Sequence, residues 1–179
     1  MDADKLAHQV MEYGQPAYTE IVKMFGAGIL SPDGIIDRKR LGDIVFRDHD
    51  KRKALECIVH TYVIRQYRQL TAEAQNQTEY AFIIWDAPLL AEAGLHKECG
   101  LVLLVTAGFE LKLSRILIRD GITNEQANLR LLSQPSDDVL YKTLIADIGK
   151  DRVKIIENNG DLEDLEIKTR MAVSGCQVI

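Results

Sequence analysis

Asp86 is the acidic side chain whose position most suggests chemistry. It directly follows the continuous apolar run at residues 80–85, which predicts a strand buried on both faces of a parallel sheet. At the carboxyl end of such a strand, a carboxylate can meet the magnesium ion of a bound nucleotide. A turn-forming aspartate ahead of Pro88 is the competing interpretation, and this residue alone leaves both open.

Two more aspartates, Asp2 and Asp4, stand at the start of the first predicted helix with one residue between them. The positive end of a helix stabilises carboxylates. Plain helix capping therefore explains the pair as well as catalysis does.

Arginines form the basic counterpart. Arg115 and Arg119 are four residues apart, which places them on one helix face, and Arg130 follows beyond the next turn. Guanidinium groups presented together can clamp phosphate oxygens through forked hydrogen bonds. The alternative is a solvated face on which the arginines pair with Asp120 and Glu125.

Motif searches exclude several other sites. His8 and His60 lie on predicted helices without HExxH or another metal spacing, so both are interpreted as packed or surface histidines, and no protein-bound transition metal is expected. Neither GxxxxGK[ST] nor GxGxxG occurs in the 179 residues. The sequence alone therefore contains no phosphate-loop signature.

Composition narrows the class of protein. With 46% hydrophobic and 27% charged residues, the chain predicts one globular domain, or one domain with a helical insertion. Its net charge of -5 argues against a nucleic-acid partner. The three cysteines form no CxxC pair, and no apolar run approaches the ~20 residues that cross a bilayer. We expect a cytoplasmic protein without a membrane partner.

The hydrophobic pattern alternates between helical and strand periods. It predicts strands at 80–85, 101–105 and 153–157. The predicted helices cover 4–26 with a break at Gly14 and Pro16, about 38–79, 111–119, 123–134 with Thr123 as N-cap, 139–147, and a last helix near 162–167. Strands separated by helices indicate an α/β fold with a parallel sheet, whose ligands bind at the carboxyl ends of the strands.

An ordered series of short segments resembles dephospho-CoA kinase, which phosphorylates the ribose 3′-hydroxyl of dephospho-CoA with ATP in the last step of coenzyme A synthesis. The segments run over roughly residues 2–165, and none is specific alone. They are DAD at 2–4, GQPAY at 14–18, LGDIVF at 41–46, DAPLL at 86–90, RDG at 119–121 and NNG at 158–160. Their number and order make a chance match improbable.

The resemblance implies a fold and a division into parts. The fold is a parallel-sheet, three-layer kinase of the P-loop type, with a helical substrate-binding insertion and a helical lid. The kinase core would comprise residues 1–30, 80–110 and 135–179, the CoA-substrate domain 31–79, and the lid 111–134.

The resemblance also implies roles for individual residues. Asp4 matches the base that accepts the proton of the attacking hydroxyl, and Arg115 matches the lid arginine that spreads over the transferring phosphoryl group. Asp86 would hold Mg²⁺, and with Asp4 and Arg115 it would flank that group. The remaining assignments are substrate contacts at Asp2, His8, His60, Asp86, Pro88 and Leu89, and nucleotide contacts at Arg119, Asn158 and Gly160.

Three departures from the family pattern stand out. His8 replaces an arginine that is more frequent in the family, and Thr61 replaces a usual proline. Family members also begin with a strand and a glycine-rich loop ending in GK[ST], which these 179 residues lack. A late start site, a truncated gene, or a separate chain that supplies the unit would each explain this.

Two expectations follow from the third departure. The isolated chain should bind ATP poorly and turn over little, or it should be a non-catalytic CoA-binding protein or a relic fragment. Residues 82–85 and 102–105 should run parallel on either side of an empty strand position.

Overall fold

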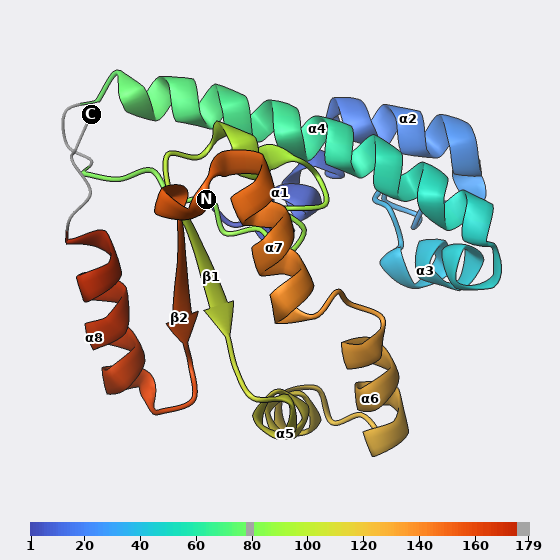
Figure 1. The fold of residues 1–179 in the computed structure, drawn as a ribbon. Coiled ribbons are helices and arrows are strands. Elements are labelled where there is room, and N and C mark those ends of the chain that lie inside the picture. Colours follow the sequence, from blue (N-terminus) through green and yellow to red (C-terminus); the bar gives the residue numbers. More distant parts are fainter. Residues whose placement is uncertain (78–80, 175–179) are drawn as a thin grey trace. The chain divides into compact units, whose positions relative to one another are not determined.

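The computed structural model describes residues 1–77 and 81–174 (Figure 1). Two compact units make up the chain, Met1–Pro88 and Leu89–Ile179, here called the N-terminal and the C-terminal unit. In the part of the chain that is described, no helix is both long and apolar enough to cross a membrane.

The described part of the N-terminal unit is helical. Aspartates begin three of its helices: Asp2, Asp37 and Asp48 each accept backbone N–H groups of the first turn, and a proline stands in the first turn of the fourth. Its elements are α1 (Ala3–Val10), α2 (Pro16–Phe25), the short 3₁₀ turn η1 (Ala27–Ile29), α3 (Arg38–Arg47) and α4 (His49–Gln75). The predicted break at Gly14 and Pro16 is confirmed.

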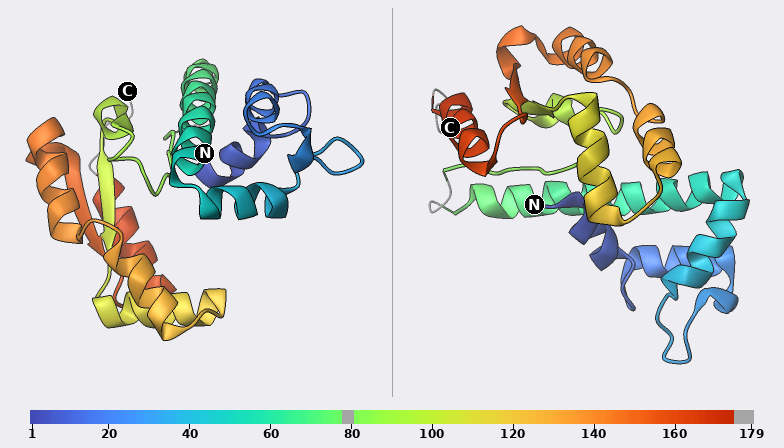
Figure 2. Two further views of the ribbon diagram at one scale, coloured as in Figure 1. Left: turned by 90° about the vertical axis from the view of Figure 1, so that its right-hand side faces the viewer. Right: turned by 90° about the horizontal axis from the view of Figure 1, so that it is seen from below.

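One apolar core holds these helices together. Figures 1 and 2 show α1, α2 and α3 along the 27-residue helix α4, and all three contact it. Each helix buries one stripe, as expected of amphipathic helices. The fully or nearly buried side chains are Leu6, Val10, Ala17, Ile21, Ile29, Ile36, Leu41, Val63 and Tyr67.

The strand predicted at residues 80–85 is wrong for the described positions 81–85, which belong to no strand. Phe82 is 46% and Ile84 is 69% exposed, so this apolar run is not buried on both faces either. Backbone hydrogen bonds join residues 84–86 to residues 1–3. This pairing is too short to form a regular strand. Residue 80 lies outside the described residues.

The C-terminal unit contains the parallel sheet that the sequence predicts. Strands β1 (Val102–Thr106) and β2 (Val153–Glu157) pair in parallel, with Val102 opposite Val153 and Thr106 opposite Glu157. The predicted strands at 101–105 and 153–157 are therefore confirmed to within one residue. The helical elements are η2 (Leu95–Glu98), α5 (Phe109–Asp120), α6 (Asn124–Leu132), α7 (Asp137–Ile148), η3 (Lys150–Arg152) and α8 (Leu162–Val173).

Helices α7 and α8 cover this sheet. Leu144 and Ile148 of α7 pack on Val102 and Val153, and α8 lies beside β2 (Figure 1). Burial is incomplete, because Val105 is 52% exposed. Among the described residues the sheet has two strands, and the prediction that 82–85 and 102–105 flank an empty position stays a prediction.

Helix-terminus chemistry accounts for the start of α6. The Thr123 hydroxyl accepts the Gln126 N–H, and the Gln126 side chain accepts the Thr123 N–H, so a complete capping box begins the helix. The predicted N-cap is thus confirmed. The lid predicted at 111–134 coincides closely with α5 and α6, but its role as a lid stays a prediction.

Candidate active site

Asp2 and Asp86 lie side by side although 84 positions separate them. They form an isolated parallel β-bridge, in which the Ala3 N–H donates to the Asp86 carbonyl at 2.8 Å and the Asp86 N–H donates to the Met1 carbonyl at 2.8 Å. The Met1 amine adds a bond of 2.7 Å to the Ile84 carbonyl. Backbone bonds therefore fix the main chain at both aspartates without using the Asp86 carboxylate, whereas the Asp2 carboxylate accepts the Lys5 N–H at 3.1 Å.

Tyr67 of α4 is the buried anchor beneath this bridge. Its side chain is fully buried, and its hydroxyl donates to the Asp86 carbonyl at 2.9 Å and lies 3.3 Å from the Met1 carbonyl. Burial first, then the charges of Asp86, Asp2 and Asp4, raise the pKa of Tyr67 to about 12. The Tyr67 hydroxyl thus ties α4 to both backbone segments of the bridge.

Asp4 lies on the exposed side of the first turn of α1, next to the N-cap Asp2. The Lys5 backbone N–H holds the pKa of the Asp2 carboxyl below its usual value, so Asp2 acts as a helix cap. The Asp4 side chain has no hydrogen-bond or ion-pair partner within the described residues. Its predicted role as a general base stays a prediction.

Both predicted histidines are exposed in the N-terminal unit. His8 follows Asp4 by four residues, hence on the same face of α1, and its Nε2 lies 2.7 Å from a terminal guanidinium nitrogen of Arg38 at the start of α3. His60 is exposed on α4, seven residues before Tyr67. Its role as a substrate contact stays a prediction, as do those of exposed Pro88 and of Leu89 in the other unit.

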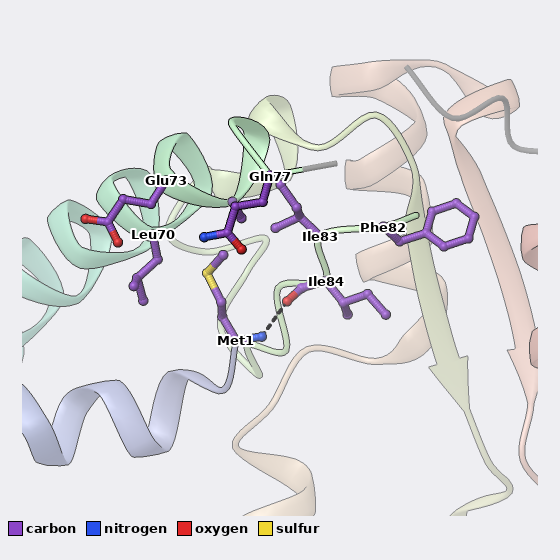
Figure 3. A pocket seen from close by; sticks show the side chains of 8 residues that line it. Met1, Leu70, Glu73, Gln77, Phe82, Ile83 and Ile84 are labelled. Carbon is purple, nitrogen blue, oxygen red and sulfur yellow. Dashed lines mark hydrogen bonds between the residues drawn. The ribbon is translucent and has the colours of Figure 1, made fainter. Parts of the chain in front are cut away.

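A shallow hollow of about 330 Å³ opens between the end of α4 and residues 82–84 (Figure 3). Met1, Leu70, Phe82 and Ile84 give it a mostly apolar lining, to which Gln77 and Glu73 add polar groups. None of the predicted site residues lines it. We therefore do not assign this hollow to the substrate.

In the C-terminal unit, Arg115 joins two segments that are 43 residues apart. Its guanidinium donates to the Asn158 carbonyl at 2.9 Å, to Asn158 Oδ1 at 3.3 Å and to the Gly160 carbonyl at 3.4 Å. Three residues predicted separately, Arg115, Asn158 and Gly160, thus belong to one cluster.

This cluster lies at the carboxyl ends of β1 and β2, the edge where parallel sheets bind ligands. The Asn158 N–H donates to the Thr106 carbonyl at 2.7 Å, and the Gly108 N–H donates to Asn159 Oδ1 at 2.9 Å. Gly160 is constrained as well, because a Cβ there would lie 2.6 Å from an Asp164 carboxylate oxygen. The NNG turn is therefore fixed on both sides.

Arg119 does not join this cluster. It forms a forked ion pair with Asp120, which Arg130 also contacts, as the solvated-face interpretation expects. Hydrogen bonding to Arg119, with a smaller effect of Arg130, holds the pKa of the Asp120 carboxyl below its usual value. A direct role of Arg119 in nucleotide binding stays a prediction.

No group of three or more His, Cys, Asp or Glu side chains placed to hold a metal ion occurs among the residues described. Asp86, however, has an exposed carboxylate without a hydrogen-bonding side-chain partner in that part of the chain. Mg²⁺ is often held by one or two carboxylates together with substrate phosphates and water. Asp86 fits that mode of binding.

Two contacts escaped the sequence interpretation. Tyr67 was recognised as part of the apolar stripe of α4, but nothing in that stripe indicates that its hydroxyl bonds two carbonyls. The Arg38–His8 contact joins helices α3 and α1, 30 residues apart, and no spacing rule predicts it.

Comparisons with known proteins agree with the resemblance. The family model of dephospho-CoA kinase matches residues 1–164. A dephospho-CoA kinase of Shouchella clausii is 40% identical over 164 residues, which is 92% of this chain and 79% of that protein.

Solved structures show the same relationship. The dephospho-CoA kinase of Campylobacter jejuni superposes with a TM-score of 0.62 at 26% identity, over 97% of this chain and 82% of its own. A crystal structure of a Thermus thermophilus protein gives 0.70 at 27% identity, over 99% and 84%. The α/β kinase fold with a parallel sheet is thereby established, and the chain belongs to the dephospho-CoA kinase family.

Proposed function

We propose that this chain provides the acceptor site and part of the nucleotide site for ATP-dependent phosphorylation of the ribose 3′-hydroxyl of dephospho-CoA. The observation that carries the proposal is the backbone bridge between Asp2 and Asp86 at the start of α1, with Asp4 in the first turn exposed and unpaired in the described part of the chain. A free carboxylate beside a fixed backbone bridge suits a base for a bound hydroxyl.

Asp4 accepts the proton as the hydroxyl oxygen bonds to the γ-phosphorus of ATP, while the bond from that phosphorus to the β,γ-bridging oxygen breaks and ADP leaves. Asp4 lies in the first turn of α1, and the bridge between the N-cap Asp2 and Asp86 fixes that end of the helix, so little reorganisation is needed when substrate binds. A general base contributes about 10² to 10⁴ in rate. The larger share comes from positioning and from stabilisation of the phosphoryl charge.

Arg115, Asn158 and Gly160 form the nucleotide side. The guanidinium stays close to the NNG turn and can move a hydrogen bond from a carbonyl to a phosphate oxygen, which is a stronger, charge-assisted partner. When bound, Mg²⁺ neutralises phosphate charge, and Asp86 is the residue that would hold it together with phosphate oxygens and water.

Phosphotransfer also needs a phosphate loop. No GxxxxGK[ST] occurs in the 179 residues, and that motif supplies backbone amides and a lysine for the β- and γ-phosphates. We propose that turnover requires such a loop, encoded with this chain or on another chain.

The same observation favours a second candidate, a non-catalytic protein that binds dephospho-CoA or CoA. Isothermal titration with dephospho-CoA, combined with mass detection of CoA after incubation with ATP and Mg²⁺, separates the two. The chain and a version extended by a strand and GK[ST] loop are compared. Phosphorylation by the extended version supports the kinase, whereas binding without phosphorylation in either version supports the binding protein.

A further inference from the structure

We propose that Lys112 is a positioning residue for Arg115, because its ion pair with Asp137 anchors helix α5 at the edge of the nucleotide site. The inference rests on the proposed function, which assigns Arg115 to the phosphates of ATP. Neither Lys112 nor Asp137 is among the site residues that the sequence predicts. The proposal begins from the two bonds of 2.7 Å between Lys112 Nζ and the Asp137 carboxylate oxygens.

This ion pair differs from the local pairs on α4 and α8. Those join exposed side chains four residues apart on one helix, and such pairs contribute little to stability. Lys112 and Asp137 are 25 residues apart, and their side chains are only 32% and 31% exposed. Salt screens a partly buried pair less, and this one uses both carboxylate oxygens. It can therefore hold two helices in one arrangement.

The position of Lys112 has no explanation within its own helix. Lys112 lies at the end of the first turn of α5, where its N–H donates to the carbonyl of the N-cap Gly108 at 2.9 Å. The positive end of a helix disfavours a cation and favours a carboxylate such as Asp137, the first residue of α7. The tertiary contact with Asp137 therefore accounts for a lysine at this place.

The pair closes the segment that carries Arg115. Figure 1 shows α5 and α6 beyond the carboxyl ends of β1 and β2, with α7 returning along the sheet. Helix α5 packs on α6, whereas α7 packs on Val102 and Val153 of the sheet. The bond from Lys112 to Asp137 thus ties the start of α5 to a helix that is fixed on the sheet.

Arg115 lies three residues after Lys112, at a neighbouring position on the surface of α5. Helix α5 therefore has two anchors, which are Lys112 on α7 and the Arg115 guanidinium on the turn at residues 158–160. When a phosphate oxygen takes the guanidinium donors, the second anchor is lost and the first remains. Lys112 then keeps the backbone of Arg115 in place while the side chain turns to the phosphate, which pre-organises the site.

Amide hydrogen exchange in the 179-residue chain tests the anchor without any reaction. The variants are Lys112→Met, Lys112→Arg and Asp137→Asn. Asp138→Asn is the matched control, because it removes an exposed charge from the same turn of α7. We expect the amides of α5 to exchange roughly 2- to 10-fold faster in Lys112→Met and Asp137→Asn, and those of α8 to keep their rates. Lys112→Arg and Asp138→Asn should stay close to the unsubstituted chain.

Kinetics of the version extended by a strand and GK[ST] loop test whether the anchor acts through Arg115. We expect Lys112→Met to lower kcat roughly 10-fold, less than the ~10²-fold that a misplacement of about 1 Å can cost. The Kd for dephospho-CoA should change little, and Lys112→Arg should restore most of the rate. In an Arg115→Ala background, Lys112→Met should lower kcat less than about twofold, because no guanidinium remains to be positioned.

The two measurements separate the possible outcomes. Equal losses of kcat in both backgrounds would show a general structural effect and overturn the assignment, as would equal α5 exchange rates in Lys112→Met and Asp138→Asn. Phosphorylation with an unchanged kcat in Lys112→Met would overturn the inference and leave the proposed function standing. Faster α5 exchange in Lys112→Met, without phosphorylation by the extended version, would contradict the proposed function yet support the anchor at Lys112.

Discussion

The acidic residues of the N-terminal unit and the arginine of the C-terminal unit are held in opposite ways. Asp86 is fixed by backbone bonds and by the Tyr67 hydroxyl bonded to its carbonyl, which leaves the carboxylates of Asp4 and Asp86 exposed. Arg115, in contrast, is fixed through its own guanidinium, which bonds Asn158 and Gly160.

This difference indicates how each region meets a ligand. A hydroxyl can bind Asp4 without breaking any side-chain contact found among the described residues. A phosphate oxygen, however, must compete with two backbone carbonyls for Arg115. We therefore expect substitutions in the acidic region to affect chemistry most, and substitutions in the NNG turn to affect stability first.

The largest effect is expected for Asp4→Asn in the version extended by a phosphate loop. The amide can still hydrogen-bond the sugar but cannot take its proton, so turnover should fall about 10² to 10⁴-fold while the Kd for dephospho-CoA changes little. Steady-state kinetics and calorimetry measure the two quantities. Glu12→Gln, beyond the end of α1, is the charge-matched control, and unchanged turnover in Asp4→Asn would remove this residue from the mechanism.

Gly160→Ala tests whether the NNG turn is tightly packed. The added Cβ would lie 2.6 Å from Asp164 Oδ2 and 3.1 Å from Asp164 Cβ, so we expect the free energy of unfolding to fall by about 1–3 kcal/mol. Urea unfolding measures the change. In the double variant Gly160→Ala/Asp164→Ala, the free energy of unfolding should fall by less than the sum of the losses measured in the two single variants. Strictly additive losses would show that contact with Asp164 is not the cause.

Tyr67→Phe tests the anchor of the acidic region. The variant keeps the ring beside Trp85, 5.1 Å away between centroids, but leaves the Asp86 and Met1 carbonyls without this donor. We expect the free energy of unfolding to fall by about 1–2 kcal/mol. Fluorescence of Trp85, the single tryptophan, monitors the unfolding transition. Tyr62→Phe, whose exposed hydroxyl bonds Glu20, should cost less, and an equal cost would contradict the anchoring role.

The smallest expected effect is a difference in how salt changes the pKa values of the Asp2 and Asp120 carboxyls. The Lys5 backbone N–H lowers the pKa of Asp2 from 3.8, whereas the charged Arg119 side chain lowers that of Asp120 from 3.8. Because both folded values are depressed, each carboxyl stabilises the fold above pH 3.8 and loses that contribution as pH falls through its folded pKa. NMR titration at low and high salt should show the Asp120 pKa rising with salt more than the Asp2 pKa, and equal sensitivity would contradict this division of causes.

Local sequence signals predicted the C-terminal unit well. The predicted N-cap Thr123 begins α6, and the predicted strand at 153–157 matches β2 residue for residue. Such features depend on neighbouring residues and on backbone chemistry, which a sequence contains directly.

The run at 82–85 shows the limit of this reasoning. An apolar run indicates a segment suited to a strand, but a strand also needs a partner ladder, which no local pattern specifies. The contacts of Arg115 with Asn158 and of Arg38 with His8 were invisible for the same reason, because they join distant helices and loops. Family resemblance indicated Arg115, Asn158 and His8 individually, and the fold supplied their partners.

The most direct test of the central claim is a crystal structure of the loop-extended protein with dephospho-CoA and a non-hydrolysable ATP analogue. We predict that an Asp4 carboxylate oxygen lies about 2.6–3.2 Å from the ribose 3′-hydroxyl, the reach expected of a general base. A 3′-hydroxyl bound to another side chain, with Asp4 facing solvent, would contradict the account.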